Sequence, residues 1–329
     1  MIESVGIGRH WHGGMLWVLI ERRAARCLSG PTAGMCLGSR SPACSAAAAT
    51  ARSTPALTWR LLLRPSPSLA LTGATLSAGL CFRCPAMRSG QVLMLWSAPR
   101  SRSTAFFRMM TQRGDFTAVH EPFSYLAEFG YTPLGGTRVM SASALLGGLR
   151  HLAASRPVFV KETTGKRYPE VLGDEDFMSR DAVHTFLIRH PRETIASRHP
   201  LDPDARVEKV GFESLFEVYT EAARLTGEDP VVIDAADLVA RPAALVRAYC
   251  ERVGIAFIPQ ALTWPPEDRP EWGLSSRWHA DAAASTGFAS PSAAGSHLSV
   301  DVERHPVLSG YLARHLPFYA ELHARRLTA

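Results

Sequence analysis

The strongest constraint on the fold is an alternation of short apolar strands with helical segments, which begins at Gln91. The strands are too apolar to have one face in water, and such strands separated by helices are typical of a parallel sheet covered on both faces. We therefore expect an α/β fold, a three-layer sandwich with a central parallel sheet. Pro317 predicts a kink or break in the last helix. The expected strands are Val92–Trp96, Thr117–His120, Val158–Lys161, His184–Arg189 and Val231–Asp234, and the expected helices lie near residues 103–113, 140–154, 191–199, 212–226, 242–253 and 306–326.

The first 86 residues differ from the rest in composition. They are rich in Ala, Ser, Arg, Gly and Pro, contain no lysine, and show no sustained hydrophobic period. We expect residues 1–86 to be disordered or no genuine part of the fold. Met87 stands just before the first strand, so the favoured hypothesis is a native start there, with an organelle transit peptide as the alternative. The folded domain is expected to span residues 87–329.

The distribution of charge and cysteine restricts the partners. The chain has a formal charge of +6, but residues 1–86 carry +7, which leaves −1 for the remaining 243 residues. Because affinity for nucleic acid depends on the cations presented, we expect no nucleic-acid partner. No stretch reaches the ~20 apolar residues that span a bilayer, so no membrane anchor is expected. Of the six cysteines only Cys250 lies in the later region, which is typical of a cytoplasmic protein without disulfides.

The segment SAPRSRST, residues 97–104, follows the first predicted strand. In open α/β sheets ligands bind beyond the carboxyl ends of the strands, and a helix N-terminus directs N–H groups and its positive dipole end toward an anion. Two arginines in one tight turn repel each other unless an anion offsets their charge. The turn therefore predicts an anion site, and a plain helix cap by Ser101 or Ser103 is the alternative. The P-loop of nucleotide triphosphatases has this architecture, but its glycine and lysine are missing here.

Two motifs resemble those of the sulfotransferase family, whose donor is 3′-phosphoadenosine-5′-phosphosulfate. PRSRST, residues 99–104, is similar to the family's 5′-phosphosulfate loop, P-[KR]-S-G-[ST]-T. FLIRHPRETIASRHP supplies Arg189 and Ser197, which correspond to the arginine and serine that hold the donor's 3′-phosphate. The departure is Arg102 where glycine is usual, which either alters the backbone approach to the donor or adds a phosphate contact. The alternative without a function for the second motif is an exposed arginine and a serine whose hydroxyl bonds to the backbone of its own helix.

This resemblance, to the bacterial branches of the family and their P-loop-like strand-turn-helix, implies a function. The protein would move a sulfuryl group from the phosphosulfate donor, as co-substrate and without a metal, to a hydroxyl of a small-molecule or carbohydrate acceptor. The segment RWHADAAASTGF, residues 277–288, is placed like the family's loop that closes over the donor. The implied donor-binding residues are Arg100, Ser101, Arg102, Ser103, Thr104, Arg189, Ser197, Arg277, Ser285, Thr286 and Gly287.

The resemblance also implies catalytic residues. Arg100 would stabilise the leaving oxygens, because a loose, in-line transfer depends on positioning and charge stabilisation. The family's base is a histidine or a glutamate, and AVHEPF offers His120 and Glu121 after the second strand, with Glu121 favoured. A core or turn histidine is an equal alternative for His120. Lys161 would bind donor or acceptor, or else form a salt bridge with the acidic segment 174–176.

Two other functions remain open from the sequence. A P-loop kinase using ATP and magnesium would need an acid after a strand, and Asp234 is the only well-placed candidate. Two features weigh against a kinase: the P-loop lysine is absent, and the Arg189 and Ser197 pair is present. A catalytically silent nucleotide-binding module would need Arg189 and Ser197 but not Glu121.

Overall fold

The computed structural model describes residues 8–12, 15–19, 87–288 and 300–329. Strands β1 (Gly8–His12) and β2 (Met15–Leu19) form an antiparallel hairpin, which the sequence did not predict. The other residues of the segment 1–86, for which disorder is predicted, lie outside the described part. All further description concerns residues 87–288 and 300–329.

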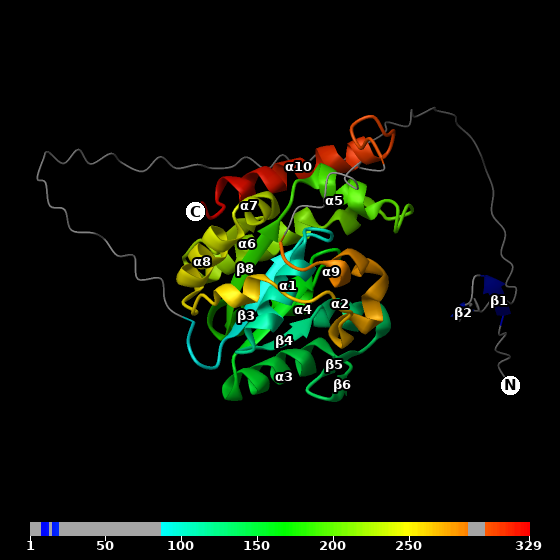
Figure 1. The fold of residues 1–329 in the computed structure, drawn as a ribbon. Coiled ribbons are helices and arrows are strands. Elements are labelled where there is room, and N and C mark those ends of the chain that lie inside the picture. Colours follow the sequence, from blue (N-terminus) through cyan, green and yellow to red (C-terminus); the bar gives the residue numbers. More distant parts are fainter. Residues whose placement is uncertain (1–7, 13–14, 20–86, 289–299) are drawn as a thin grey trace, which may run out of the picture. The chain divides into compact units, whose positions relative to one another are not determined.

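The centre of this domain is a sheet of five strands, all parallel, in the order β4-β7-β3-β8-β9 (Figure 1). The predicted α/β fold with a central parallel sheet is therefore confirmed. Each predicted strand is present within two residues of its expected bounds. The strands are β3 (Val92–Ser97), β4 (Thr117–His120), β7 (Val158–Thr163), β8 (Ala182–Ile188) and β9 (Val231–Asp234).

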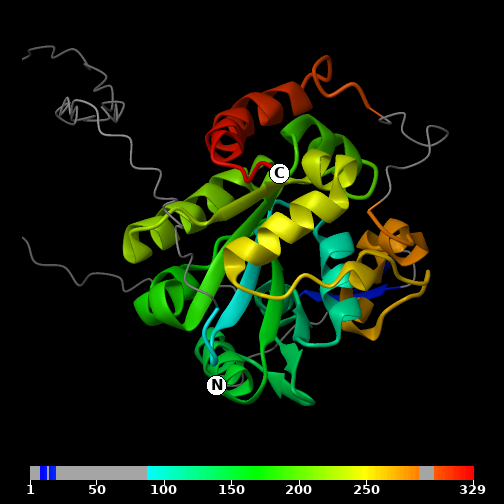
Figure 2. The same cartoon turned by 60° about the vertical axis from the view of Figure 1, so that its left-hand side comes forward.

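Helices cover both faces of this sheet (Figure 2). Those that the sequence predicted are α1 (Ser103–Arg113), α3 (Ala142–Ser155), α5 (Pro191–Arg198), α6 (Phe212–Thr226), α8 (Pro242–Val253) and α10 (Leu308–Ala324). Shorter elements without a clear sequence signal are α2 (Pro122–Phe129), β5 (Thr132–Leu134), β6 (Thr137–Val139), α4 (Pro169–Leu172), the π-helix η1 (Phe177–Asp181), the 3-10 helices η2 (Val207–Val210), η3 (Pro259–Leu262) and η4 (Pro270–Trp278), α7 (Ala235–Ala240) and α9 (Ala280–Ala284).

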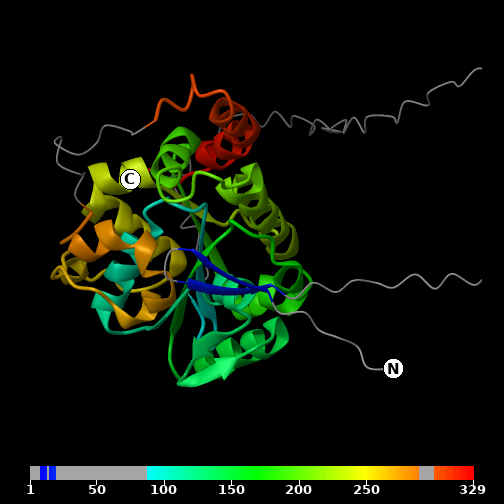
Figure 3. The ribbon, with the colours of Figure 1, turned by 90° about the vertical axis from the view of Figure 1, so that its right-hand side faces the viewer.

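Strand β3 explains why the domain has two apolar layers. Its side chains alternate between the faces of the sheet, as the geometry of a strand requires. Met94 and Trp96 pack with residues of α3, α6 and α10, whereas Leu93 and Leu95 pack with residues of α1 and α8. All four side chains are fully buried, because β3 lies at the centre of the sheet. In Figures 1 and 3, α10 and α3 lie at opposite ends of the domain.

Helix α10 corrects part of one expectation, the break that was one of two outcomes predicted for Pro317. It runs through Pro317 from Leu308 to Ala324, so the predicted break is absent. A proline removes one backbone hydrogen bond but does not end a helix whose two halves are both packed. Here Leu308 and Leu322, on either side of the proline, are buried in the same apolar layer. Within the described ranges, no helix is long and apolar enough to cross a membrane.

The order of the strands determines where a ligand can bind. The chain passes from β3 to the edge strand β4, returns through β7 on one side of β3, and then continues with β8 on the other side. Ser97, the last residue of β3, therefore stands opposite both Thr163 of β7 and Leu187 of β8. The chain reverses its direction across the sheet at this point, which is where open α/β sheets bind ligands.

Candidate active site

The turn between β3 and α1 has an uncommon backbone conformation. Arg100 and Arg102 both have positive φ angles, 68° and 64°, in the left-handed region that disfavours side chains. Arg102 is the N-cap residue of α1, and no side chain caps this helix. The alternative in which Ser101 or Ser103 caps α1 is therefore wrong. The Ser101 hydroxyl is buried and has no hydrogen-bond partner among the residues described.

The two family motifs meet at this turn. The Arg189 Nη1 atom donates a hydrogen bond of 3.1 Å to the backbone oxygen of Arg100, across 89 positions of sequence. The Arg100 Nε atom in turn donates to the hydroxyl of Ser197 at 3.1 Å. The meeting follows from the sheet order, because β3 and β8 are neighbours and Arg189 and α5 follow β8. The serine thus faces the turn, rather than only its own helix.

The turn carries more positive charge than its acidic neighbours offset. The Arg100 side chain is 16% exposed, and its nearest carboxylate, Asp281, lies 3.8 Å away and is 97% exposed. Such an exposed partner contributes little. Burial lowers the pKa of the Arg100 guanidinium, Asp281 opposes this in part, and Arg189 lowers the pKa further. The Arg189 Nε atom pairs with Glu193 at 2.7 Å. Arg100 and Arg102 thus form a cationic turn at a helix N-terminus, which is suited to an anion.

The segment from η4 to α9 closes one side of this turn. The Arg100 Nη1 atom donates to the backbone oxygen of Trp278 at 2.5 Å, and the Thr104 hydroxyl lies 3.0 Å from Nδ1 of His279. The predicted closing loop therefore does contact the turn, but through two residues that the sequence analysis did not select. Both contacts come from its beginning.

The four residues selected in that loop lie elsewhere. Arg277 is exposed, with its guanidinium 4.7 Å from the ring centroid of Trp278. The Ser285 hydroxyl accepts a hydrogen bond from the Trp264 indole at 3.1 Å, and the Thr286 oxygen accepts one from the Trp264 backbone. Gly287 forms an isolated bridge with Thr263. These contacts anchor the end of the loop, so a donor contact by any of the four remains a prediction.

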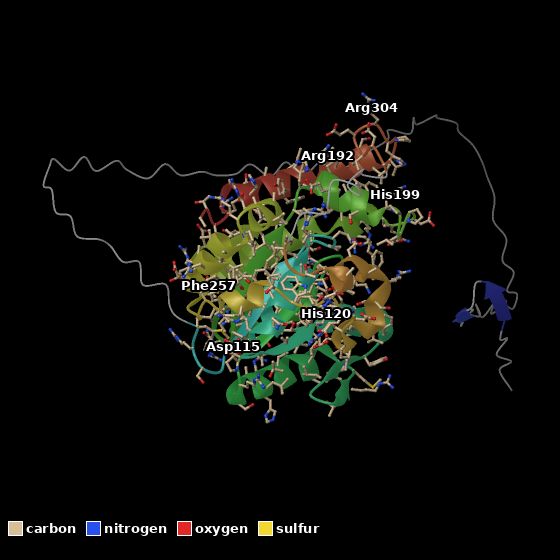
Figure 4. All side chains as sticks on the ribbon, viewed as in Figure 1. Asp115, His120, Arg192, His199, Phe257 and Arg304 are labelled. Carbon is tan, nitrogen blue, oxygen red and sulfur yellow. The ribbon has the colours of Figure 1, made fainter. Side chains whose placement is uncertain are left out.

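A chain of hydrogen bonds leads from the turn to His120. His279 links the Thr104 hydroxyl to that of Ser275, which lies 3.0 Å from Nε2. Ser275 lies 2.8 Å from the Tyr125 hydroxyl, which lies 2.8 Å from Nδ1 of His120. The Nε2 atom of His120 is buried and has no partner in the described part of the chain. His120 is buried, and its label in Figure 4 stands over the middle of the domain, away from those of Arg192, in α5, and His199, at the end of α5.

The two histidines of this hydrogen-bond chain, His120 and His279, are neutral near pH 7. Burial, together with Lys161, holds the pKa of His120 well below its usual range. Burial, followed by Lys161 and Arg100, lowers the pKa of His279 to about 2. A neutral imidazole has one nitrogen that accepts a hydrogen bond or a proton, and in His120 this is Nε2 when Nδ1 carries the hydrogen.

Glu121 begins α2 directly after β4. Its φ angle of 44° is the third positive value among the non-glycine residues described, and all three belong to this site. Its side chain is 12% exposed and forms an ion pair with Lys161, which is 1% exposed. The alternative partner of Lys161, the acidic segment, is wrong: Asp174 pairs with Arg150 and Asp176 with Arg180.

Glu162 anchors the first turn of α2, and the sequence analysis did not select it. Its carboxylate is fully buried and accepts hydrogen bonds from the backbone of Phe123 at 2.8 Å and of Ser124 at 3.2 Å, in the first turn of α2. The hydroxyl of Ser124 and the backbone of Thr163 also donate to it. Burial, with Glu121 nearby, raises the pKa of Glu162 to about 7. Glu162 thus fastens the start of α2, and with it Glu121, to β7.

His120, Glu121 and His279 also meet the geometric condition for a metal site, with ligand atoms within 4.8 Å of one another. Their present partners fit a polar network better. The Glu121 carboxylate is paired with an ammonium group, and both ring nitrogens of His279 are hydrogen-bonded. A cation here would displace these partners and lie beside Lys161.

Comparison with known proteins places this geometry in a family. A family model described as "Sulfotransferase domain" matches residues 91–326. A solved sulfotransferase domain from the curacin biosynthetic pathway is 15% identical and aligns over 72% of this chain and 99% of its own length, with a TM-score of 0.48. The corresponding domain of the Synechococcus PCC 7002 olefin synthase is 16% identical over 74% of this chain and 98% of its own, with a TM-score of 0.45.

A curated relative has a different name. The branched-chain-amino-acid aminotransferase-like protein 1 of Arabidopsis thaliana is 29% identical over 215 residues, which is 62% of this chain and 38% of that protein. The chain therefore spans less than two fifths of the length of this relative. The family model, in contrast, covers both motifs and the whole parallel sheet. The chain belongs to the sulfotransferase domain family.

Proposed function

We propose that this protein transfers a sulfuryl group from 3′-phosphoadenosine-5′-phosphosulfate to a hydroxyl of a small-molecule or carbohydrate acceptor. Membership of the family supports sulfuryl transfer, and the donor and the acceptor class are the proposal. Its main support is the meeting of the two motifs. One guanidinium, Arg189, and one hydroxyl, Ser197, both bond to Arg100 of the turn. A donor with phosphate groups on both sides of its ribose suits two adjoining anion sites of this kind.

In this proposal the turn stabilises the leaving group. The acceptor oxygen forms a bond to sulfur while the bond between sulfur and the 5′-phosphate oxygen breaks, and 3′-phosphoadenosine-5′-phosphate leaves. Negative charge builds on that phosphate oxygen, so fixed cations and N–H groups stabilise the transition state. Arg100 and the free N–H groups at the start of α1 are the groups proposed for this role. The buried Ser101 hydroxyl is a further donor without a partner of its own among the residues described.

The acceptor hydroxyl must also lose its proton. Glu121 is the proposed base, and its ion pair with Lys161 fixes the orientation of the carboxylate. The free Nε2 atom of the neutral His120 makes that histidine the competing candidate. Hydrogen bonds through Tyr125, Ser275 and His279 connect His120 to Thr104 of the turn, and Glu121 is the next residue after His120.

The proposal is tested by comparing nucleotides in thermal unfolding. We expect 3′-phosphoadenosine-5′-phosphate, at about 100 times its dissociation constant, to stabilise the protein by about 2.7 kcal/mol. For a domain of this size that is a rise in Tm of roughly 5–10 °C. ATP with magnesium, at the same concentration, is expected to give a much smaller rise, and magnesium alone serves as control. A rise with ATP and magnesium but none with the bisphosphate would contradict the proposal and favour the kinase.

A further inference from the structure

Arg102 occupies a position for which its side chain is poorly suited. Its φ of 64° and ψ of 16° are left-handed, a conformation that glycine adopts without penalty and side chains do not. Its side chain makes no cap for α1, although N-cap positions favour short polar residues or glycine. Residues held in such conformations cluster at functional sites, where the surrounding structure enforces them. A glycine would fit this turn better, so another requirement must keep the arginine.

The surroundings of Arg102 point to that requirement. Arg100 and Arg189 each have a carboxylate partner, Asp281 and Glu193, whereas in the described part of the chain no carboxylate forms an ion pair with Arg102. The guanidinium is also partly buried. Glu193 and Asp281 act on Arg102 only from beyond ion-pair distance, and each already pairs with another arginine. A partly buried cation without an ion-pair partner of its own, next to two other cations, is destabilising in the free protein. A bound anion would remove this penalty.

The position of Arg102 indicates which anion. The Arg189 guanidinium donates to the backbone oxygen of Arg100, two residues before Arg102. Arg189 also opposes Arg102 electrostatically: after burial, it is the group that lowers the pKa of Arg102 most. The Arg189 and Arg102 charges are therefore close together, and Arg189 and Ser197 both bond to Arg100, two residues before Arg102.

We propose that Arg102 is a specificity residue that, together with Arg189, binds the 3′-phosphate of the nucleotide. This inference rests on the proposed function, because it assumes a nucleotide with phosphates on both sides of the ribose. The arginine selects nucleotides that carry the second phosphate, and the strained turn lowers the stability of the ligand-free protein.

The test combines three variants with two nucleotides. Arg102→Ala removes the charge but keeps a side chain in the left-handed conformation, and Arg102→Gly removes both. Arg252→Ala, at an exposed position of α8, is the control for the loss of one positive charge. Affinities for 3′-phosphoadenosine-5′-phosphate and for adenosine 5′-monophosphate are measured by calorimetry, and Tm is measured without ligand.

We expect both Arg102 variants to bind the bisphosphate about 10- to 100-fold more weakly, the range for one lost charge-assisted hydrogen bond. Their affinity for the monophosphate should stay near that of the wild type. Only Arg102→Gly should gain stability from relief of the backbone, by a few degrees in Tm above Arg102→Ala. The control should match the wild type in both affinities.

Four results would overturn the inference or an argument on which it rests. Equal weakening for both nucleotides would assign Arg102 to the 5′-phosphate instead. Unchanged affinity for both would mean that the side chain faces water. An Arg102→Gly variant no more stable than Arg102→Ala would remove the argument from backbone strain. A wild type that binds neither nucleotide would overturn the proposed function itself, and this inference with it.

Discussion

Two helices of this protein begin at the same edge of the sheet, and their first turns are built differently. Helix α7 follows β9, and Asp234, at φ −98°, accepts a hydrogen bond of 2.7 Å from the backbone of Ala236. Helix α1 follows β3, and its N-cap Arg102 makes no such bond. The first turn of α7 contains an acidic residue, Asp237, and that of α1 contains none. One helix is capped by its own carboxylate, and the other presents cations.

The difference explains why an anion is expected at only one of these turns. A carboxylate on the first N–H groups of a helix satisfies them and complements the dipole, so no ligand is needed. Asp234 also accepts a hydrogen bond from the Tyr319 hydroxyl at 3.2 Å. The acid that the kinase alternative requires for magnesium therefore has a complete structural role. At α1 the N-cap residue is Arg102, and the buried Ser101 hydroxyl before it has no partner among the residues described.

The largest expected effect is a loss of turnover when the proposed base, Glu121, is replaced. Glu121→Gln keeps the size of the side chain and removes the proposed base, so we expect kcat to fall about 10²- to 10⁴-fold. Affinity for 3′-phosphoadenosine-5′-phosphate should change little, because the turn itself is intact. Steady-state kinetics with the donor and a model phenol or alcohol acceptor, together with calorimetry, measure both quantities.

His120→Ala is the matched comparison for that experiment. If His120→Ala lowers kcat severely and Glu121→Gln does not, then His120 is the base and the assignment to Glu121 is wrong. Comparable losses in both variants would indicate that the ion pair and the polar chain act together.

A smaller effect is expected from the buried core rather than from the turn, and it concerns the pH dependence of stability. His184 accepts a hydrogen bond from the Trp96 indole at 2.9 Å, and burial lowers its pKa to about 4. Because the pKa is lower in the folded state, the unfolded state binds more protons between about pH 6.5 and pH 4. The free energy of unfolding should therefore decrease as the pH is lowered through this window, and His184 should account for about 3 kcal/mol of the decrease.

Urea unfolding at pH 7, 5.5 and 4.5 measures that slope. In His184→Gln, an amide replaces the imidazole and does not titrate, so the curve should be flatter than that of the wild type. His279 and His120 contribute to the slope in both proteins, since their pKa values are also lowered. The same slope in variant and wild type would show that His184 is not buried as a neutral group.

The sequence predicted which residues meet at the turn better than it predicted the polar chain beside it. Arg100, Arg189 and Ser197 belong to local motifs at strand ends, so the expected parallel sheet was enough to bring them together. His279, Tyr125 and Ser275 meet through tertiary packing of η4 against α2 and β4, and their local sequence carries no mark of it. The hairpin of β5 and β6 and the short helices were missed because their residues have too little periodicity.

The position of Lys161 shows a different kind of error. The strand was expected to end there, before the polar residues Glu162 and Thr163. In the structure β7 continues to Thr163, and Glu162 is buried because backbone and side-chain donors satisfy its carboxylate. Polarity alone is therefore a poor guide to a strand end where the next helix supplies hydrogen-bond donors.

Calorimetric titration of four proteins with 3′-phosphoadenosine-5′-phosphate tests the central claim, that the turn between β3 and α1 holds the donor. The proteins are the wild type, Arg100→Ala, Arg189→Ala and Asp234→Asn, which keeps the cap of α7 but removes its charge. The account predicts binding to one site, at least about 10-fold weaker in each arginine variant and unchanged in Asp234→Asn. Unchanged affinity in both arginine variants, with binding lost in Asp234→Asn, would contradict it.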